Sequence, residues 1–254
     1  MNLERVIAVR NNKTVYRSGD KCIKVFSANF SKADVLNEAL NQARIEEADL
    51  NIPRVLEVAV VDGQWAIVSE FIQGKTLAQL MKENPENFND YLEFFIDLQM
   101  KVHACTAPML NSLTEKLSRK IRQSNLSATT RIDLHHRLEN LPQQNNVCHG
   151  DFNPSNIVIT EDGTPYILDW SHATQGNVCA DVSRTYLYLL FSGETETATQ
   201  YLERFCEKSN TDPRDVQKWI PIVAASQSVK SNTLEREFLL SSITLSILRK
   251  ERSL

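Results

Sequence analysis

The stretch that decides the fold of this chain is residues 149–170, HGDFNPSNIVITEDGTPYILDW. Two short apolar runs, Ile157-Val158-Ile159 and Tyr166-Ile167-Leu168, lie on either side of the turn Asp162-Gly163. Runs of this kind around an Asp-Gly turn predict a β-hairpin. Because a hairpin brings its two ends side by side, we expect the residues just before and just after it to be neighbours.

Three oxygen-bearing side chains surround this hairpin: Asp151 on the preceding loop, Asn156 at the entrance and Asp169 at the exit. Amide and carboxylate oxygens suit Mg²⁺, so Asn156 and Asp169 are candidate ligands. Asp151 is then left to take the proton of an attacking hydroxyl. A base, an Asn five positions later and an Asp beyond a hairpin form the phosphoryl-transfer arrangement of kinases. Each residue alone would be interpreted as a turn or cap residue, but their order and spacing favour catalysis.

The motif HGDFNPSNI followed by YILDW resembles the aminoglycoside phosphotransferase and choline kinase family of kinase-like small-molecule phosphotransferases. The family pattern is HGD-x-x-x-x-N followed by Asp-Trp or Asp-Asp, and the resemblance covers nearly the whole chain, with weaker support at both ends. Asn153 and Ser155 replace the His and Gly of the commonest form, which bears on substrate identity more than on the reaction. The resemblance implies an α+β, protein-kinase-like fold of two lobes. The N-lobe is a small antiparallel sheet with one helix, and the C-lobe is larger and mainly helical.

The composition is that of a soluble globular protein. The chain has 254 residues, a formal net charge of −4, 42% hydrophobic residues and 24% charged residues, with the charge evenly spread. This gives no support to a nucleic-acid or membrane partner. The five cysteines include no Cys-x-x-Cys pair, which argues against a zinc site or disulfide framework and for a reducing compartment. With no signal-peptide core or run of about 18 apolar residues, we expect a cytoplasmic protein.

The first 70 residues predict a small β lobe. Glu4–Val9, Lys13–Arg17 and Lys21–Phe26 are short alternating runs, and Ser18-Gly19-Asp20 suits a hairpin turn between the last two. Lys24 lies in the middle of the third run, on the face opposite its apolar neighbours. A strand lysine is usually solvated, but the family resemblance implies that its ammonium reaches the α- and β-phosphates of a nucleotide.

The next segment predicts a helix over Ser31–Leu50, with Ser31 as its N-cap. In kinase-like folds the strand lysine pairs with a glutamate on this helix. Glu38, in the first half of the helix and among apolar residues, is the candidate partner of Lys24. Glu46 and Glu47 are expected to be exposed.

Two further strands, Arg54–Val61 and Gln64–Phe71, run into the segment SEFIQGKTL. This segment resembles the hinge between kinase lobes, where backbone groups of Glu70 and Ile72 would bond the adenine edge. Gly74 gives the chain freedom to turn. We therefore predict a nucleotide-binding lobe over residues 1–73 and a helical lobe with the catalytic loop and substrate site over residues 74–254.

The loop between the first two strands contains no glycine, although many kinases cover the triphosphate with a glycine-rich loop. Asn11 and Asn12 tolerate left-handed backbone dihedrals better than most residues, so a tight turn stays open to this sequence. Lys13 and Thr14 are alternative phosphate contacts. Solvent exposure is the default for both, and neither is included among the candidate site residues.

The chain beyond Gly74 predicts mostly helices. We interpret His103, on one of them, as a core or cap residue. Asp181 fits the N-cap of an apolar helix, and the resemblance implies that it supports the catalytic loop. The predicted helices are Thr76–Lys82, Phe88–Ala104, Ser112–Gln123, Ala128–Leu141, the helix beginning at Asp181, Glu194–Ser209, Asp212–Gln227 and Thr233–Arg252.

Three functions are open to this sequence. The leading one is an ATP- and Mg²⁺-dependent phosphotransferase acting on a hydroxyl of an aminoglycoside-, choline- or sugar-like molecule. A protein kinase is disfavoured, because only about ten residues separate Asp169 from Asp181 and no Ala-Pro-Glu stretch follows. A non-catalytic nucleotide-binding module is the third, although the candidate base and both candidate metal ligands are present. The acceptor and the oligomeric state are left open.

Overall fold

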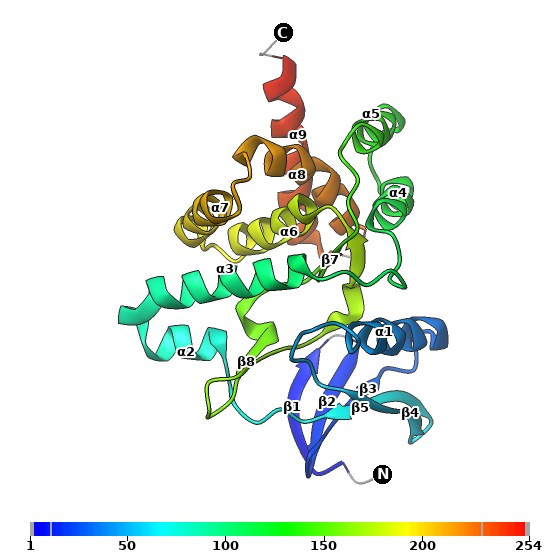
Figure 1. Cartoon of the computed structure of the whole chain (residues 1–254). Coiled ribbons are helices and arrows are strands. Elements are labelled where there is room, and N and C mark those ends of the chain that lie inside the picture. The colour runs from blue at the N-terminus through cyan, green and yellow to red at the C-terminus, as the bar shows by residue number, and fades with distance from the viewer. Residues whose placement is uncertain (1–2, 11, 230, 252–254) are drawn as a thin grey trace. The chain divides into compact units, whose positions relative to one another are not determined.

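The computed structural model describes residues 3–10, 12–229 and 231–251, and it divides into two compact units. Unit 1 comprises Met1–Tyr91 and Pro154–Ala173, and unit 2 comprises Leu92–Asn153 and Thr174–Leu254. Strands dominate unit 1 and helices dominate unit 2 (Figure 1). The predicted α+β class, with an antiparallel sheet towards the N-terminus and helices towards the C-terminus, is confirmed.

The main sheet of unit 1 has five antiparallel strands in the order β1-β2-β3-β5-β4. Alternation along β3 sends Ile23 and Val25 to one face of the sheet, where they join an apolar cluster. Lys24 therefore belongs to the other face. The strands are β1 (Arg5–Arg10), β2 (Lys13–Ser18), β3 (Lys21–Phe26), β4 (Val55–Val61) and β5 (Gln64–Glu70).

Helix α1 (Lys32–Ile45) packs on the sheet through a second apolar cluster that includes Phe26, Val35 and Ile67. Figure 1 shows α1 beside the strands of the sheet. The predicted N-cap is confirmed, because the Ser31 hydroxyl accepts a hydrogen bond from the backbone N–H of the third residue that follows it. The helix is shorter than predicted, and the chain turns after Ile45.

The predicted hairpin is confirmed as β8 (Ile157–Ile159) paired antiparallel with β9 (Pro165–Ile167). A two-residue strand, β6 (Lys75–Thr76), pairs with β8, and Thr76 then caps α2 (Leu77–Glu83). This pairing explains why unit 1 continues beyond residue 73 and includes the hairpin. The predicted lobe boundary after residue 73 differs from this division and stays a prediction.

Gly74 is required for close packing rather than for a turn. Its φ lies outside the left-handed region, and a Cβ added to it would lie 2.2 Å from the Ile159 carbonyl oxygen and 2.9 Å from Val158 Cγ1. The backbone before β6 therefore passes directly against β8. Only glycine fits there without moving the hairpin, which ends just before Asp169.

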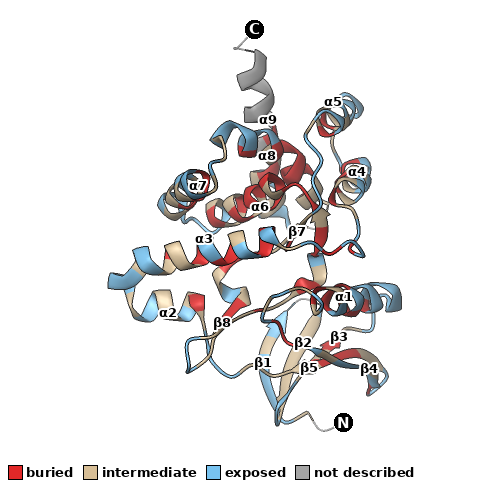
Figure 2. Ribbon diagram, in the orientation of Figure 1, coloured by how far each residue is buried: buried red, intermediate tan, exposed pale blue. Residues whose placement is uncertain are grey.

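Unit 2 is built from helices around a small two-stranded sheet, β7 (Asn146–Cys148) and β10 (Thr174–Gly176). Its core includes the fully buried side chains of Trp219 and Tyr201, and many residues of α6 and α8 are buried (Figure 2). Arg252, the last residue of the final predicted helix, lies outside the described residues. The helices are α3 (Phe88–Ala104), α4 (Leu113–Gln123), α5 (Ala128–Glu139), α6 (Val178–Phe191), α7 (Thr195–Ser209), α8 (Pro213–Gln227) and α9 (Thr233–Glu251).

One helix start differs from the prediction. Helix α6 begins at Val178, and its N-cap is Asn177, whose side chain accepts from the backbone N–H of Cys179. Asp181 was predicted to be this cap, but it lies inside the first turn of the helix. Within the described residues, no helix is long and apolar enough to cross a membrane.

The close approach at Gly74 gives a first prediction. Gly74→Ala should lower the free energy of unfolding by about 3 kcal/mol, because the new methyl group overlaps backbone atoms that cannot move independently. The matched control is Gly163→Ala, at the turn of the same hairpin, where a Cβ meets nothing within 4 Å but φ is +83°. That variant should lose only about 1 kcal/mol of backbone strain. Urea unfolding of both variants measures the difference, and equal losses would contradict the packing argument.

Candidate active site

Lys24 and Glu38 form an ion pair, as the sequence predicted. Lys24 projects from the middle of β3, and Glu38 lies on α1, one turn after the buried Val35. The two carrier elements are fixed by the apolar cluster between α1 and the sheet. The pairing is therefore confirmed, whereas the contact of Lys24 with phosphate stays a prediction.

Asp169 lies on the other side of the Lys24 ammonium, with Oδ1 3.4 Å from Nζ. It directly follows the hairpin and has a left-handed backbone conformation, with φ +60°. The amide of Asn41 on α1 donates to the Ser171 carbonyl at 3.2 Å, which fixes the segment after Asp169 to the helix. Strand β3, helix α1 and the exit of the hairpin thus meet at one group of charges.

Lys13 belongs to the same group, and the sequence analysis left it out. Its Nζ lies 3.3 Å from Asp169 Oδ2 and 3.5 Å from Glu38 Oε1, and only 19% of the side chain is exposed. The expectation of solvent exposure is wrong. The strand register explains this position of Lys13, because Val15 pairs with Lys24. Lys13, two positions before Val15, shares its face of β2, and a long side chain spans that diagonal.

The two lysines keep the Asp169 carboxylate charged. Burial alone would lower the pKa of Lys24, but the carboxylates of Asp169 and Glu38 raise it above its ordinary value. Burial alone would raise the pKa of Asp169, but Lys24 and Lys13 hold it well below its usual range. Asp169 therefore offers an ionised oxygen at any physiological pH. We call Lys13, Lys24, Glu38 and Asp169 the unit 1 charge cluster.

The two predicted metal ligands lie at adjacent points of the backbone. The backbone N–H of Leu168 donates to the Asn156 carbonyl at 2.7 Å, so the entrance and exit of the hairpin are side by side as expected. An amide oxygen and an ionised carboxylate are ligands that suit Mg²⁺, which takes its other ligands from water and phosphate. Among the described residues, no three His, Cys, Asp or Glu side chains gather as a metal site. The role of Asn156 and Asp169 as magnesium ligands stays a prediction.

Asp151 lies on the loop after β7 in unit 2. Gly150 has φ +77°, so the chain turns there as predicted. The Asp151 N–H donates to His149 Nδ1 at 3.2 Å, and the Asn153 amide donates to the Asp151 carbonyl at 3.0 Å. The Asp151 carboxylate accepts a hydrogen bond from Arg184 Nη2 at 3.2 Å, and 30% of its side chain is exposed. A fixed, partly exposed carboxylate is suited to accept a proton.

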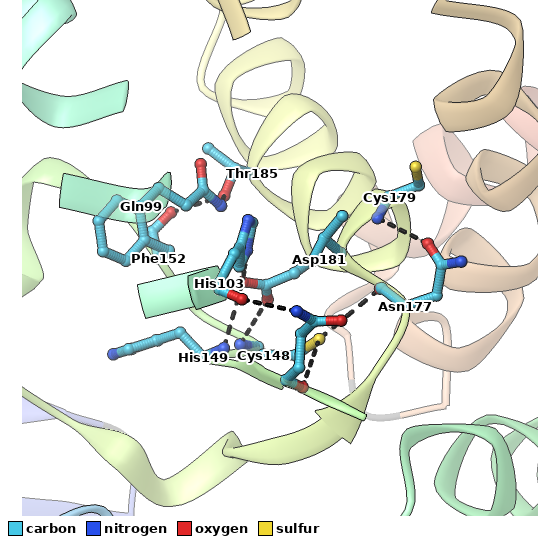
Figure 3. Close-up of polar contacts among 12 residues, drawn as sticks. Gln99, His103, Cys148, His149, Phe152, Asn177, Cys179, Asp181 and Thr185 are labelled. Atoms are coloured by element: carbon cyan, nitrogen blue, oxygen red, sulfur yellow. Dashed lines mark hydrogen bonds and ion pairs between the residues drawn. The ribbon is translucent and has the colours of Figure 1, made fainter. Parts of the chain in front are cut away.

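The carboxylate of Asp181 holds this loop by accepting hydrogen bonds from backbone N–H groups of the loop (Figure 3). It is buried and accepts from the N–H groups of His149 at 3.1 Å and Gly150 at 2.7 Å. His103 Nε2 lies 3.0 Å from the same carboxylate. Burial alone would raise the pKa of Asp181, but the hydrogen bond and charge of His103 lower it. The expected support of the loop is confirmed, and His103 has a more specific role than core packing.

Arg184 is a second residue that the sequence analysis missed. It lies three positions after Asp181 on α6, so both side chains share a face of the helix. The neighbouring Thr185 hydroxyl donates to the Phe152 carbonyl at 2.9 Å, which attaches the helix to the loop beyond Asp151. The helical spacing from Asp181 was the available signal.

The structure does not bring Glu70 and Ile72 into the unit 1 charge cluster. The Glu70 N–H donates to the Arg54 carbonyl at 3.0 Å, and its side chain accepts from the Arg54 N–H at 3.0 Å. Ile72 lies in the irregular segment after β5. Their contact with adenine stays a prediction.

The sequence matches the model of a phosphotransferase enzyme family over residues 4–219. Among curated proteins, no sequence matches the chain. Three solved structures illustrate the shared fold. A thermostable mutant of aminoglycoside phosphotransferase APH(4)-Ia, apo form, is similar with a TM-score of 0.73 and 15% identity, over 98% of this chain and 95% of that one.

Choline kinase LicA from Streptococcus pneumoniae is similar with a TM-score of 0.61 and 15% identity, over 97% of this chain and 92% of that one. A choline/ethanolamine kinase family protein from Mesorhizobium loti has a TM-score of 0.58 and 16% identity, over 98% of this chain and 87% of that one. The aminoglycoside enzyme has also been solved as a ternary complex with AMP-PNP and hygromycin B. At these identities the structures establish a common fold.

The ion pair gives a second prediction, which needs no substrate. Lys24→Met and Glu38→Gln should each lower the free energy of unfolding by about 1–3 kcal/mol, because each leaves a charge with fewer partners. The double variant should lose less than the sum of the two. Urea unfolding of the four proteins completes the double-mutant cycle.

The control cycle uses Lys75 and Glu83, whose ammonium and carboxylate lie 2.7 Å apart with side chains 59% and 49% exposed. An exposed pair of this kind should show a coupling of about 0.5 kcal/mol or less. Strict additivity of the Lys24 and Glu38 losses would show that the pair is not coupled.

Proposed function

Since the chain belongs to the phosphotransferase enzyme family, we propose that it transfers the γ-phosphate of ATP to a hydroxyl group of a small molecule. The unit 1 charge cluster is the observation that carries this proposal. Two lysines held by the carboxylates of Asp169 and Glu38 would form a polyphosphate site in which the cations are already oriented. The AMP-PNP complex of the aminoglycoside enzyme supports nucleotide binding in this fold.

In this proposal Lys24 and Lys13 bind the phosphates, and Glu38 fixes the direction of Lys24. Asn156 and Asp169 would hold Mg²⁺, which supplies charge neutralisation between the phosphate oxygens when it is bound.

The adenine would be bound by the backbone of the segment after β5, at Glu70 and Ile72. This part of the proposal rests on the resemblance to the kinase hinge.

Asp151 would act as the base. The acceptor oxygen forms a bond to the γ-phosphorus, the bond from that phosphorus to the ADP oxygen breaks, and the hydroxyl proton passes to the Asp151 carboxylate. Asp181 and His103 would act through the backbone of the loop, by holding Asp151 in place.

A protein substrate is not favoured. Strand β10 begins at Thr174 and helix α6 at Val178, so both elements follow Asp169 closely. The chain has no room there for the long segment on which a peptide would dock. ATP binding without transfer to any acceptor would instead support a non-catalytic module.

The base gives a third prediction. Asp151→Asn keeps the shape of the side chain and removes its charge, so kcat should fall by about 10²–10⁴-fold. An acceptor screen with ATP and Mg²⁺, followed by ADP release, identifies the substrate for this measurement. Calorimetry should give the wild-type affinity for Mg·ATP. The exposed Asp215→Asn serves as the control, and a wild-type kcat in Asp151→Asn would exclude this residue as the base.

The metal ligand gives a fourth prediction. Asp169→Asn should weaken Mg·ATP binding by roughly 10–100-fold, because an ionised ligand is lost. Calorimetric titrations with Mg²⁺ and with a chelator separate metal-dependent from metal-independent binding. Chelation should weaken ATP binding to the wild type and change it little in the variant. The control is Asp162→Asn, at the exposed turn of the same hairpin, in which chelation should weaken ATP binding as much as in the wild type. The same result in Asp169→Asn would show that Asp169 is not a ligand.

A further inference from the structure

Three cationic side chains of unit 2 gather near the loop that carries Asp151. Arg184 comes from α6 and bonds the Asp151 carboxylate at 3.2 Å. Lys116 and Lys120 lie one turn apart on α4, and the positive charges of Arg184 and Lys120 both act on Lys116. Arg184, Lys116 and Lys120 have no part in the proposed phosphoryl transfer, which uses the carboxylate of Asp151 from this region.

Backbone packing places α4 close to this loop. A Cβ added to Gly176 of β10 would lie 2.4 Å from Leu113 Cβ, so the first turn of α4 lies directly against the strand. Strand β10 pairs with β7, which runs into His149 and the loop. Lys116 follows Leu113 by three positions and so lies on the same side of the helix. Its position is therefore set by a packing contact that only glycine permits.

Lys116 has the positive charges of Arg184 and Lys120 near it. Burial lowers the pKa of Lys116 to about 8, with the charges of Arg184 and Lys120 adding to the effect. The Nε atom of Arg184 is buried and has no hydrogen-bond partner among the described residues. A desolvated cation set with a spare donor costs stability, and an anion would relieve that cost.

We propose that the acceptor of this phosphotransferase carries an anionic group, a carboxylate or a phosphate, beside its hydroxyl, and that Arg184 and Lys116 bind this group. The inference rests on the proposed function and names its substrate class. An arginine fork matches the planar or tetrahedral oxygens of such a group, and a lysine adds a point charge. An acceptor with a positive charge at this place, as in choline or an aminoglycoside, would be repelled.

The same contact serves the reaction. While the anion lies on Arg184 and Lys116, the hydroxyl is within reach of Asp151, whose carboxylate shares the guanidinium. The hydroxyl oxygen bonds the γ-phosphorus, ADP leaves with the electrons of the broken bond, and Asp151 holds the released proton. The charge of the acceptor anion does not change in this step, so its contacts with Arg184 and Lys116 are equally strong in the ground state and the transition state. Loss of these contacts should therefore raise KM.

The test uses a series of small diols that differ in charge. Glycerate and glycerol phosphate are anionic, glycerol is neutral, and 3-aminopropane-1,2-diol is cationic. Binding to the full chain saturated with Mg·ADP is measured by calorimetry, and phosphoryl transfer from ATP by ADP release. The variants are Arg184→Gln and Lys116→Met, with Arg119→Gln, an exposed cation of the same helix, as the control. Comparing glycerate with glycerol phosphate distinguishes a carboxylate site from a phosphate site.

Wild type should prefer an anionic probe over glycerol and the amine. Arg184→Gln and Lys116→Met should each weaken anionic binding and raise the KM of the anionic acceptor by roughly 10–100-fold, with a much smaller change in the affinity for glycerol. In Arg184→Gln, kcat should also fall for every acceptor, because Arg184 holds Asp151. Weakening of all three acceptors by one factor would overturn the proposal, since Arg184 would then act only on Asp151. Preference for the amine, or no binding of either anionic probe, would overturn it as well. Anion binding that depends on Arg184 without any transfer would instead contradict the proposed function alone.

The pH dependence provides a second readout. Lys116 is charged below about pH 8 and neutral above it, so affinity for the anionic probe should fall as the pH rises from about 7 to 9. The charged groups that act on Lys116 are Arg184 and Asp181 of α6, Lys120 of α4 and Cys148 of β7. Lys116→Met should abolish this fall, and an unchanged pH profile in that variant would count against a role for Lys116.

Discussion

Unit 1 depends on the sharing of the Asp169 carboxylate between two lysines. A buried carboxylate is costly unless cations and hydrogen bonds compensate it, and here Lys24 and Lys13 each contact one of its oxygens. The lysines come from neighbouring strands, and Glu38 adds the helix. Four separate segments supply these groups. If one segment shifts, a charged group on another segment loses a partner of opposite charge. The cluster therefore fixes the sheet, the helix and the hairpin exit together.

Unit 2 solves the corresponding problem with backbone groups. Asp181 is more deeply buried than Asp169, and two N–H groups of the loop and the ring of His103 satisfy it. Backbone donors carry no net charge and cannot be exchanged by mutation. Consequently, the loop conformation depends on one carboxylate, whereas the direction of Asp151 also depends on the side chain of Arg184. This explains why a loop with few apolar residues can hold a fixed shape.

Most of this architecture could be predicted from local patterns. The hairpin and the cap at Ser31 followed from turn chemistry and capping. The pairing of Lys24 with Glu38 needed the resemblance to kinase-like folds as well. Lys13 and Arg184 could not be assigned in the same way, because their roles depend on pairing register and on helix packing. The predicted N-cap of α6 was wrong for a related reason. Asp181 had the composition of an N-cap, but the loop it bonds lies more than thirty positions earlier in the chain, so its partner was invisible to a local rule.

The division of the chain into two compact units has a consequence for how such enzymes diversify. The charges proposed to bind the nucleotide belong to unit 1, while Asp151, Arg184 and Lys116 belong to unit 2. Each unit has its own core. Under the proposed function, we therefore expect substitutions in α4 and α6 to alter acceptor preference with little effect on nucleotide binding, because residues that share no partners contribute independently. A lineage can then acquire a new substrate in a few steps while a working phosphate donor site is inherited unchanged.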